Sequence, residues 1–192
     1  MRQDLKIKDQ LVTGEDFIVS KHVDGVLITN PVLSEKDLFK YYDSLESGIY
    51  KIEHIPEYKS VFLEKGDSIW VRINASSFDE SIVFSGRGAA KNNFMMNLLL
   101  RFEVENTFLS SKYSSNAKAF SMLIDSLLIE KKNKWILMDS INQLTPIAQK
   151  ITQAAYIYPY ATRKERYALL RGCLLYTSPS PRDATLSRMP SS

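Results

Sequence analysis

The residues best suited to chemistry lie in a short glycine-rich segment near the middle of the chain. Gly86, Arg87, Gly88 and Lys91 fall between a stretch typical of a β-strand and one typical of a helix. The free amides at the start of a helix attract anions, and the two basic side chains would add positive charge. A phosphate loop, however, needs Gly-Lys-Ser/Thr at fixed spacing, and a dinucleotide loop needs three glycines. Neither pattern is present, so we favour a structural turn over an anion-binding site.

Other reactive side chains lack partners at a useful spacing. His22 and His54 are isolated, without a second histidine or a cysteine at the spacing of metal ligands. Asp79, Glu80 and Ser81 could support acid–base or nucleophilic chemistry, but no histidine is near them in the sequence. We therefore expect no catalytic, cofactor-binding or metal-binding residues, and no cofactor.

Tyrosines and basic residues occur together near the carboxyl end: Tyr156, Tyr158, Tyr160 and Tyr167, with Arg163, Lys164, Arg166 and Arg171. Aromatic and basic side chains together can bind single-stranded nucleic acid or glycans. At helical spacing, however, tyrosines that pack against a sheet are more common, and we favour that interpretation. We also expect Trp70, in the middle of an apolar run, to be a core residue.

The composition narrows the possible partners. The 192 residues include 25 basic and 22 acidic side chains, so the formal charge is +3. No basic face stands out, which argues against nucleic acid as the main partner. The longest apolar stretch, residues 94–100, is far shorter than the roughly 20 residues that span a bilayer. We expect no transmembrane segment, and the first residues do not resemble a signal peptide.

The first half of the chain has the pattern of a β protein. Short β-branched or aromatic runs occur at residues 17–20, 26–29, 49–52, 60–63, 68–73 and 81–84. Turn residues separate them, and strands at this spacing indicate an antiparallel sandwich or barrel. Ile69, Val71 and Ile73 alternate with Trp70 and Arg72, which indicates one buried and one partly solvated face.

Residues 33–45 fit two structures. Ser34 begins a Ser-x-x-Asp pattern that resembles a capping box and favours a helix. Enrichment in tyrosine and phenylalanine at residues 38–43 favours a strand instead.

After Gly88 the apolar residues recur every three or four positions, which predicts helices. In residues 89–109 they are Phe94, Leu98, Phe102 and Phe108. A second helix, capped by Ser114 or Ser115, carries the stripe Phe120, Leu123, Ile124, Leu127 and Leu128.

A third helix is predicted to begin at Thr145-Pro146, where a hydroxyl cap precedes proline. Its apolar face is Ile147, Ile151, Ala154, Ala155 and Tyr158. Pro159 is expected to interrupt it before a last turn at residues 163–170. The fold class is therefore α+β: an antiparallel β-sandwich-like module, residues 1–87, followed by a region of about three helices, residues 88–172.

Residues 173–192 are expected to be foreign to the natural protein. Residues 173–178, Cys-Leu-Leu-Tyr-Thr-Ser, can be encoded by TGTCTCTTATACACATCT, which resembles the transposon mosaic end used in sequencing libraries. Residues 184–192 resemble an index followed by a distal adapter. We therefore expect a non-native, disordered tail on an amino-terminal fragment whose gene continues past Gly172. The alternative is a natural Pro/Ser-rich disordered tail, but composition alone does not explain a match to two consecutive adapter pieces. The single cysteine, Cys173, lies in this tail.

Four stretches resemble a family of large Bacteroidota envelope proteins: residues 48–54, 57–74, 78–94 and 158–167. The strongest part covers roughly residues 48–94, with weaker similarity on both sides out to about Val12 and Leu170. In that family an amino-terminal β module precedes a helical region, and the chain commonly ends in a thioredoxin-like domain of the TlpA-type disulfide reductases. The resemblance implies a strand at residues 38–43 and a periplasmic or envelope-associated location. The Cys-x-x-Cys of the family has no counterpart here, so no catalytic residue is carried over.

The resemblance implies a non-catalytic accessory domain of a periplasmic thiol–disulfide oxidoreductase. It would position the missing redox domain or its substrate, so its partners would be its own carboxyl-terminal domain and a protein substrate. The alternative is an independent module that binds a peptide or glycan through exposed aromatics such as Tyr41, Tyr42 and Tyr58. An independent enzyme that uses residues 86–93 ranks below both.

Overall fold

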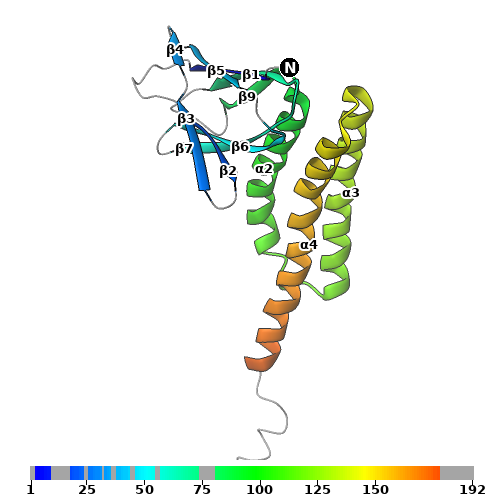
Figure 1. Cartoon of the computed structure of the whole chain (residues 1–192). Helices are drawn as coiled ribbons and strands as arrows, with labels where there is room; N and C mark the ends of the chain where they lie inside the picture. The colour runs from blue at the N-terminus through cyan, green and yellow to red at the C-terminus, as the bar shows by residue number, and fades with distance from the viewer. Residues whose placement is uncertain are drawn as a thin grey trace, which may run out of the picture.

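The computed structural model describes the backbone of residues 3–9, 18–23, 26–31, 33–35, 38–43, 46–54, 57–73 and 81–177. It describes the side chains of Ser20 and of residues 46–53, 57–73 and 81–171. Within these residues the chain forms two β-sheets followed by three helices (Figure 1). The predicted α+β class and the three helices are confirmed.

The strands are β1 (Gln3–Asp9), β2 (Ile18–Val23), β3 (Val26–Pro31), β4 (Leu33–Glu35), β5 (Leu38–Asp43), β6 (Gly48–His54), β7 (Glu57–Leu63), β8 (Ser68–Ile73) and β9 (Val83–Arg87). One sheet has the order β4-β5-β1-β8-β9, and the other has the order β3-β2-β6-β7. Neighbouring strands are antiparallel, except that β1 and β8 run parallel. The strand predicted at residues 38–43 is present as β5.

Side chains of the two sheets meet in one hydrophobic cluster: Tyr50, Ile52, Val61, Leu63, Ile69, Val71, Ile73, Ile82, Phe84, Ala89 and Met96. The alternation predicted for β8 is confirmed, because Ile69, Val71 and Ile73 are buried. Trp70 points to the opposite face and is 42% exposed. The expectation that Trp70 is a core residue is therefore wrong, since adjacent residues of a strand face opposite sides.

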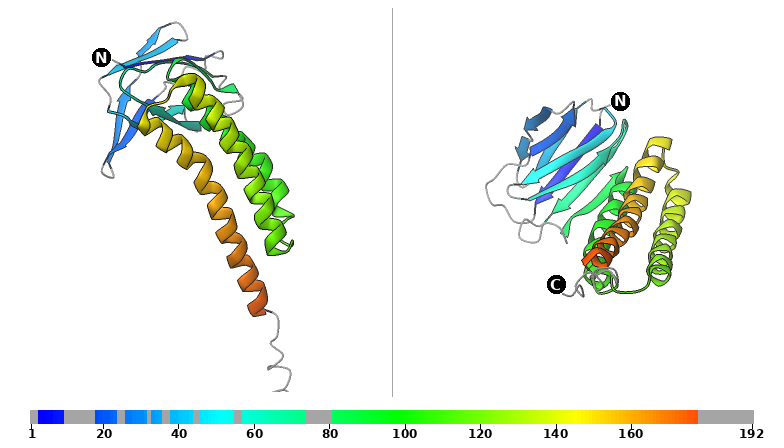
Figure 2. Two further views of the ribbon diagram at one scale, coloured as in Figure 1. Left: turned by 90° about the vertical axis from the view of Figure 1, so that its right-hand side faces the viewer. Right: turned by 90° about the horizontal axis from the view of Figure 1, so that it is seen from below.

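The helices are α2 (Ala89–Ser110), α3 (Ala117–Asn142) and α4 (Pro146–Thr177). They lie side by side, α2 is nearest to the sheets, and the last turns of α4 extend beyond the other two helices (Figures 1 and 2). The cap of α3 is Asn116, whose side chain accepts a hydrogen bond from the Ala119 N–H at 2.8 Å. Ser114 and Ser115 precede it, so the predicted cap was one or two residues early. Within the described ranges, no helix is both long and apolar enough to cross a membrane.

Helix α4 continues through Pro159, so the predicted interruption at this residue is wrong. Proline removes one helical hydrogen bond, but Tyr156 and Tyr160 on either side of it are buried among the other helices. Their packing holds the helix together across the proline. The helix also includes residues 173–177 of the predicted tail, whereas residues 178–192 lie outside the described part.

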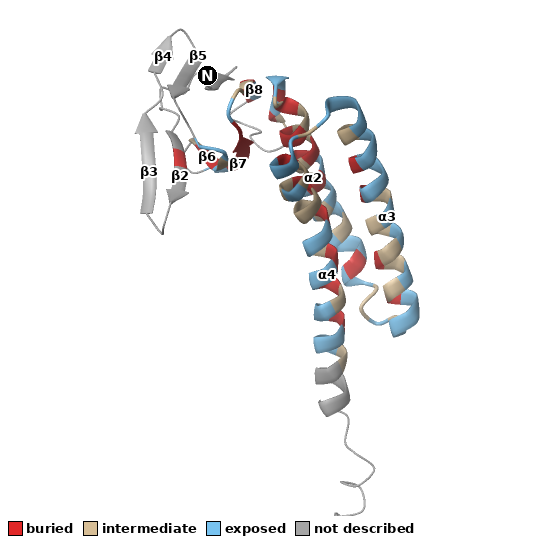
Figure 3. Cartoon of the chain, turned by 45° about the vertical axis from the view of Figure 1, so that its right-hand side comes forward, coloured by how far each residue is buried: buried red, intermediate tan, exposed pale blue. Residues whose placement is uncertain are grey.

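Helix α4 has buried positions along much of its length (Figure 3). Three of its tyrosines belong to hydrophobic clusters shared with α2 and α3. Tyr156, Tyr160 and Tyr167 are buried, whereas Tyr158 is 67% exposed. Packing is therefore confirmed for three of the four tyrosines, but their neighbours are α2 and α3, not the sheet. The aromatic ring of Tyr167 stacks on Phe120 with ring centres 4.4 Å apart.

Candidate functional site

The turn between β7 and β8 carries the chain from one sheet to the other. The Asp67 N–H donates to the Glu64 carbonyl at 3.0 Å, and the Asp67 carboxylate accepts from the Glu64 N–H at 2.8 Å. These reciprocal bonds close the turn around Lys65 and Gly66. They also place two carboxylates close together at the start of α2.

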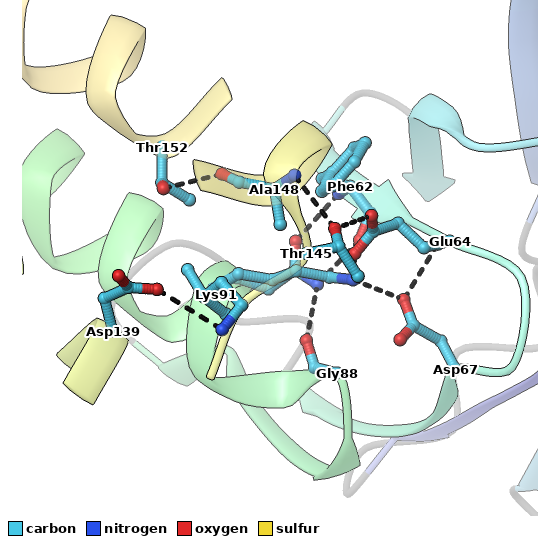
Figure 4. A network of polar contacts seen from close by, with 11 residues as sticks. Phe62, Glu64, Asp67, Gly88, Lys91, Asp139, Thr145, Ala148 and Thr152 are labelled. Atoms are coloured by element: carbon cyan, nitrogen blue, oxygen red, sulfur yellow. Dashed lines mark hydrogen bonds and ion pairs between the residues drawn. The ribbon is translucent and has the colours of Figure 1, made fainter. Parts of the chain in front are cut away.

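Lys91, in the first turns of α2, points into this turn (Figure 4). Its Nζ lies 2.6 Å from Glu64 Oε2 and 2.7 Å from Asp67 Oδ2, and the residue is only 2% exposed. The Phe62 ring lies 4.8 Å from the same ammonium group. A buried charge without a partner is strongly destabilising, so these contacts are what allow a lysine to occupy this position.

Thr145 connects the turn to α4. Its hydroxyl donates to Glu64 Oε1 and accepts from the Ala148 N–H at 3.1 Å. The predicted hydroxyl cap is therefore confirmed. We call Glu64, Asp67, Lys91 and Thr145 the junction cluster, because they join the inter-sheet turn, α2 and α4.

The glycine-rich segment meets the junction cluster at Asp67. Gly88 has φ of 94°, and a Cβ added to it would lie 2.2 Å from Asp67 Oδ1. The carboxylate of Asp67 thus already lies against the amino-terminal end of α2. Lys91 is paired with carboxylates, and Arg87 is exposed. This geometry favours the structural turn for Gly86–Lys91, and anion binding stays a prediction.

A cavity of about 410 Å³ opens beside the junction cluster. The carboxylates of Glu64 and Asp67 line it together with Lys65 and Arg87. With one ammonium and two carboxylates, the cluster carries an excess negative charge. The Lys91 ammonium is held by both carboxylates, so it is poorly suited to act as a base or to receive an anion.

Two consecutive asparagines of α2 bind the edges of the two sheets. Asn92 accepts from the Phe62 N–H at 2.7 Å and donates to the Phe62 carbonyl at 3.0 Å. Asn93 accepts from the Phe84 N–H at 3.0 Å and donates to the Phe84 carbonyl at 2.7 Å. A side-chain amide offers the same donor and acceptor as a peptide group. We call these two residues the asparagine clamp, because they hold β7 and β9, the last strands of their sheets.

A second buried polar group joins the three helices. Glu105 of α2 accepts from Lys131 of α3 at 2.6 Å and from the Tyr160 hydroxyl of α4 at 2.6 Å. Arg163 of α4 lies 3.4 Å from the same carboxylate and donates to Asn106 at 2.7 Å. Burial, and then the bond to the carboxylate, raise the pKa of Tyr160. We call Glu105, Lys131, Tyr160 and Arg163 the Glu105 hub.

The remaining sequence predictions fall largely outside the described side chains. His22 and His54 lie in β2 and β6, but only their backbone is described. Asp79 and Glu80 lie outside the described residues, and Ser81 is half-buried just before β9. Within the described ranges, no three His, Cys, Asp or Glu side chains gather closely enough to hold a metal.

Residue spacing in the sequence does not reveal the side chains that the fold brings together. Glu64, Asp67 and Glu105 carried no signal there, because ion-pair partners distant in sequence are not visible from spacing. The pair Asn92 and Asn93 could have been noticed, since two adjacent amides after a strand-to-helix junction are suited to binding strand edges.

The chain was compared with models of protein families, with curated proteins and with solved structures. None of the three comparisons found a match.

Proposed function

We propose that this protein is a non-catalytic accessory module of a thioredoxin-like thiol–disulfide oxidoreductase of the cell envelope. In this proposal it positions the redox domain or the protein substrate of that domain. The resemblance of residues 48–94 to the envelope family motivates the identity of the partner. The organisation of the molecule, a β module joined by buried polar contacts to a set of long helices, suits a positioning role.

The observation that carries the proposal is an exposed apolar stripe on α3. Met122, Ile129 and Ile136 are spaced seven residues apart and are 63%, 57% and 48% exposed. Residues at this spacing lie on one face of a helix. Leu137, 62% exposed, lies next to them. We call these four residues the α3 stripe.

The α3 stripe has the properties of a docking surface. Helix α3 packs against α2 and α4 through other residues, the buried Phe120, Ile124 and Trp135. The stripe is therefore additional apolar surface that the bundle does not need for its own packing. Apolar side chains that recur every seven residues on one helix face are typical of the seam between two packed helices.

The chemistry of thiol–disulfide exchange indicates which partner supplies the reactive cysteines. That reaction needs a cysteine thiolate that attacks a disulfide and a second thiol that resolves the mixed disulfide. The sequence contains one cysteine, Cys173. The proposed module therefore contributes surface, and the thioredoxin-like partner contributes the cysteine pair.

The test is a binding titration with the thioredoxin-like domain that the resemblance predicts in the same gene, prepared as a separate protein. We expect saturable one-to-one binding by calorimetry. The double variant Ile129→Lys, Ile136→Lys should weaken it at least about tenfold, which corresponds to about 1.4 kcal/mol. Val104→Lys is the matched control, because Val104 is a 69% exposed apolar residue on α2.

Two results would overturn the proposal. One is a gene that encodes no such domain, or a domain that does not bind. The other is reduction of insulin disulfides by this protein alone with dithiothreitol, at a rate above that of dithiothreitol without protein.

A second candidate, a ligand-binding module, is favoured by a different observation. Tyr58 is 57% exposed and lines a cavity of about 500 Å³ beside β7. The side chains of Tyr41 and Tyr42, the other aromatics expected at such a site, lie outside the described set.

A further inference from the structure

The free edge of β7 has unused backbone groups. Among the described strands, β7 is the last of its sheet, with β6 on one side. Phe62 directs its N–H and carbonyl away from β6, because both bind the side chain of Asn92. In an antiparallel strand these groups alternate in direction with a period of two residues. Ser60 and Tyr58 therefore direct their N–H and carbonyl groups to the same free side.

Nothing in the described part of the chain pairs with these outward groups of Tyr58 and Ser60. Both residues are exposed, and their register opposite Glu53 and Lys51 of β6 leaves the outer side open. The Asn92 amide occupies the place that the peptide group of another strand would take beside Phe62. A strand approaching β7 would thus begin where the asparagine clamp ends.

A groove lies along this same edge. It has a volume of about 500 Å³, and its floor and walls include Ile49, Phe62, Met95, Met96 and Leu99. Ile49 is 55% exposed and Leu99 is 37% exposed, so apolar surface is open to a ligand. A groove of this size accommodates a few side chains. We call it the β7 groove.

The rim of the β7 groove is acidic. Glu57 of β7 and Glu103 of α2 line it and are both exposed. Lys59 also lines the groove, but it is only 8% exposed. A ligand with basic residues would therefore be attracted at this rim.

We infer that the β7 groove binds an extended peptide by strand addition. The peptide backbone pairs with Ser60 and Tyr58, an apolar side chain enters between Ile49 and Leu99, and a basic residue lies near Glu57 and Glu103. Exposed edges promote such pairing, and pockets for alternate side chains give it specificity. The inference rests on the proposed function in one respect: the peptide is a segment of the protein substrate that the module positions.

The probe is a fluorescein-labelled hexapeptide of alternating valine and threonine with a lysine at each end. We expect saturable binding by fluorescence anisotropy. Methylation of the alternate backbone nitrogens of the peptide that face β7 should weaken it at least about tenfold, because each removes a hydrogen bond worth about 1 kcal/mol. This comparison alters the ligand and leaves the protein unchanged, so it does not depend on the folding of a variant.

Two protein variants locate the site. Ser60→Pro removes the outward N–H and leaves the pairing of β6 with β7 in place, and Leu99→Lys places a charge in the groove. Each should weaken peptide binding about tenfold, whereas Val104→Lys on the same helix should not change it. Replacing the terminal lysines of the peptide by glutamates should also weaken binding. The difference in affinity between the two peptides should be smaller at high salt, because salt screens the charges.

Three outcomes would overturn the inference: no binding of the peptide, equal binding of its methylated form, or a dimer of this protein that Ser60→Pro abolishes. None of them tests the α3 stripe. The two proposals can therefore fail separately. If Ser60→Pro still binds the thioredoxin-like domain and the peptide does not bind, the proposed function stands and the peptide site is wrong.

Discussion

The junction cluster and the Glu105 hub are both buried polar groups centred on a charged side chain of α2, and the two central charges have opposite signs. In the junction cluster one ammonium, that of Lys91, lies between two carboxylates. In the hub one carboxylate, that of Glu105, receives Lys131, Arg163 and the hydroxyl of Tyr160. The first group lies beside a surface cavity, and the second lies between three helices.

This difference predicts how much stability each region loses when its central side chain is replaced. Without Lys91, the carboxylates of Glu64 and Asp67 would keep the Thr145 hydroxyl and a backbone N–H as donors.

Without Glu105, Lys131 and Arg163 would lose their shared carboxylate. Lys131 would keep the more exposed Glu130, and Arg163 would keep the neutral Asn106. The charged side chains of the two groups are buried to a similar degree. The hub should be the more sensitive region, because Glu105 is the shared acceptor of three groups on two other helices and its loss leaves two buried cations without it.

The largest effect is expected for Glu105→Ala. Removal of the shared carboxylate should lower the free energy of unfolding by about 3–5 kcal/mol, because Lys131 and Arg163 are left buried with fewer partners. Urea denaturation followed by circular dichroism measures it. Glu103→Ala, an exposed glutamate on the same helix, is the control and should stay within about 0.5 kcal/mol of the unchanged protein.

A smaller effect is expected for Lys91→Met. This variant keeps the apolar stem and removes the ammonium, and the free energy of unfolding should fall by about 2–3 kcal/mol. The same denaturation experiment ranks the two regions. A loss for Lys91→Met that exceeds the loss for Glu105→Ala would contradict the comparison.

The smallest effect concerns alkaline pH. The pKa of Tyr160 is raised above its ordinary value of 10.0, first by burial and then by the bond to Glu105. Its contribution to stability is therefore complete below about pH 10 and is lost above it, by about 1.4 kcal/mol per pH unit. In Tyr160→Phe the free energy of unfolding should fall less steeply as the pH rises above about 10. At every pH it should also be lower by about 1 kcal/mol, because a hydrogen bond is missing.

Denaturation midpoints between about pH 8 and 11 measure this slope. Burial also raises the pKa of Tyr156, so part of the alkaline loss should remain in the variant. An unchanged slope in Tyr160→Phe would show that the hub does not hold a neutral tyrosine.

The sequence was sufficient for elements with strong local signals. The start of α4 at Thr145-Pro146 was predicted because a hydroxyl cap and a proline act within one turn of chain. The buried face of β8 was predicted because Ile69, Val71 and Ile73 alternate strictly. Both signals depend on neighbours in the sequence alone.

The predicted inner face of α4 is correct only in part, because Ile151, Ala154 and Ala155 are half-buried but its two end residues are not. The apolar residues Ile147 and Tyr158 are exposed, whereas the buried stripe includes Thr152 and Arg163. Thr152 is buried because it accepts a hydrogen bond from the Trp135 indole at 2.8 Å. Arg163 is buried because Glu105 and Asn106 bind it. Such partners lie on other helices, so no local pattern reveals them.

The asparagine clamp also constrains the length of the chain. Successive residues of a helix differ in direction by about 100°, and Asn92 and Asn93 each reach a different sheet. One residue inserted between Gly88 and Asn92 would turn both amides away from their strands at once. Related sequences should therefore vary in length in the connection between α2 and α3, but not within this turn.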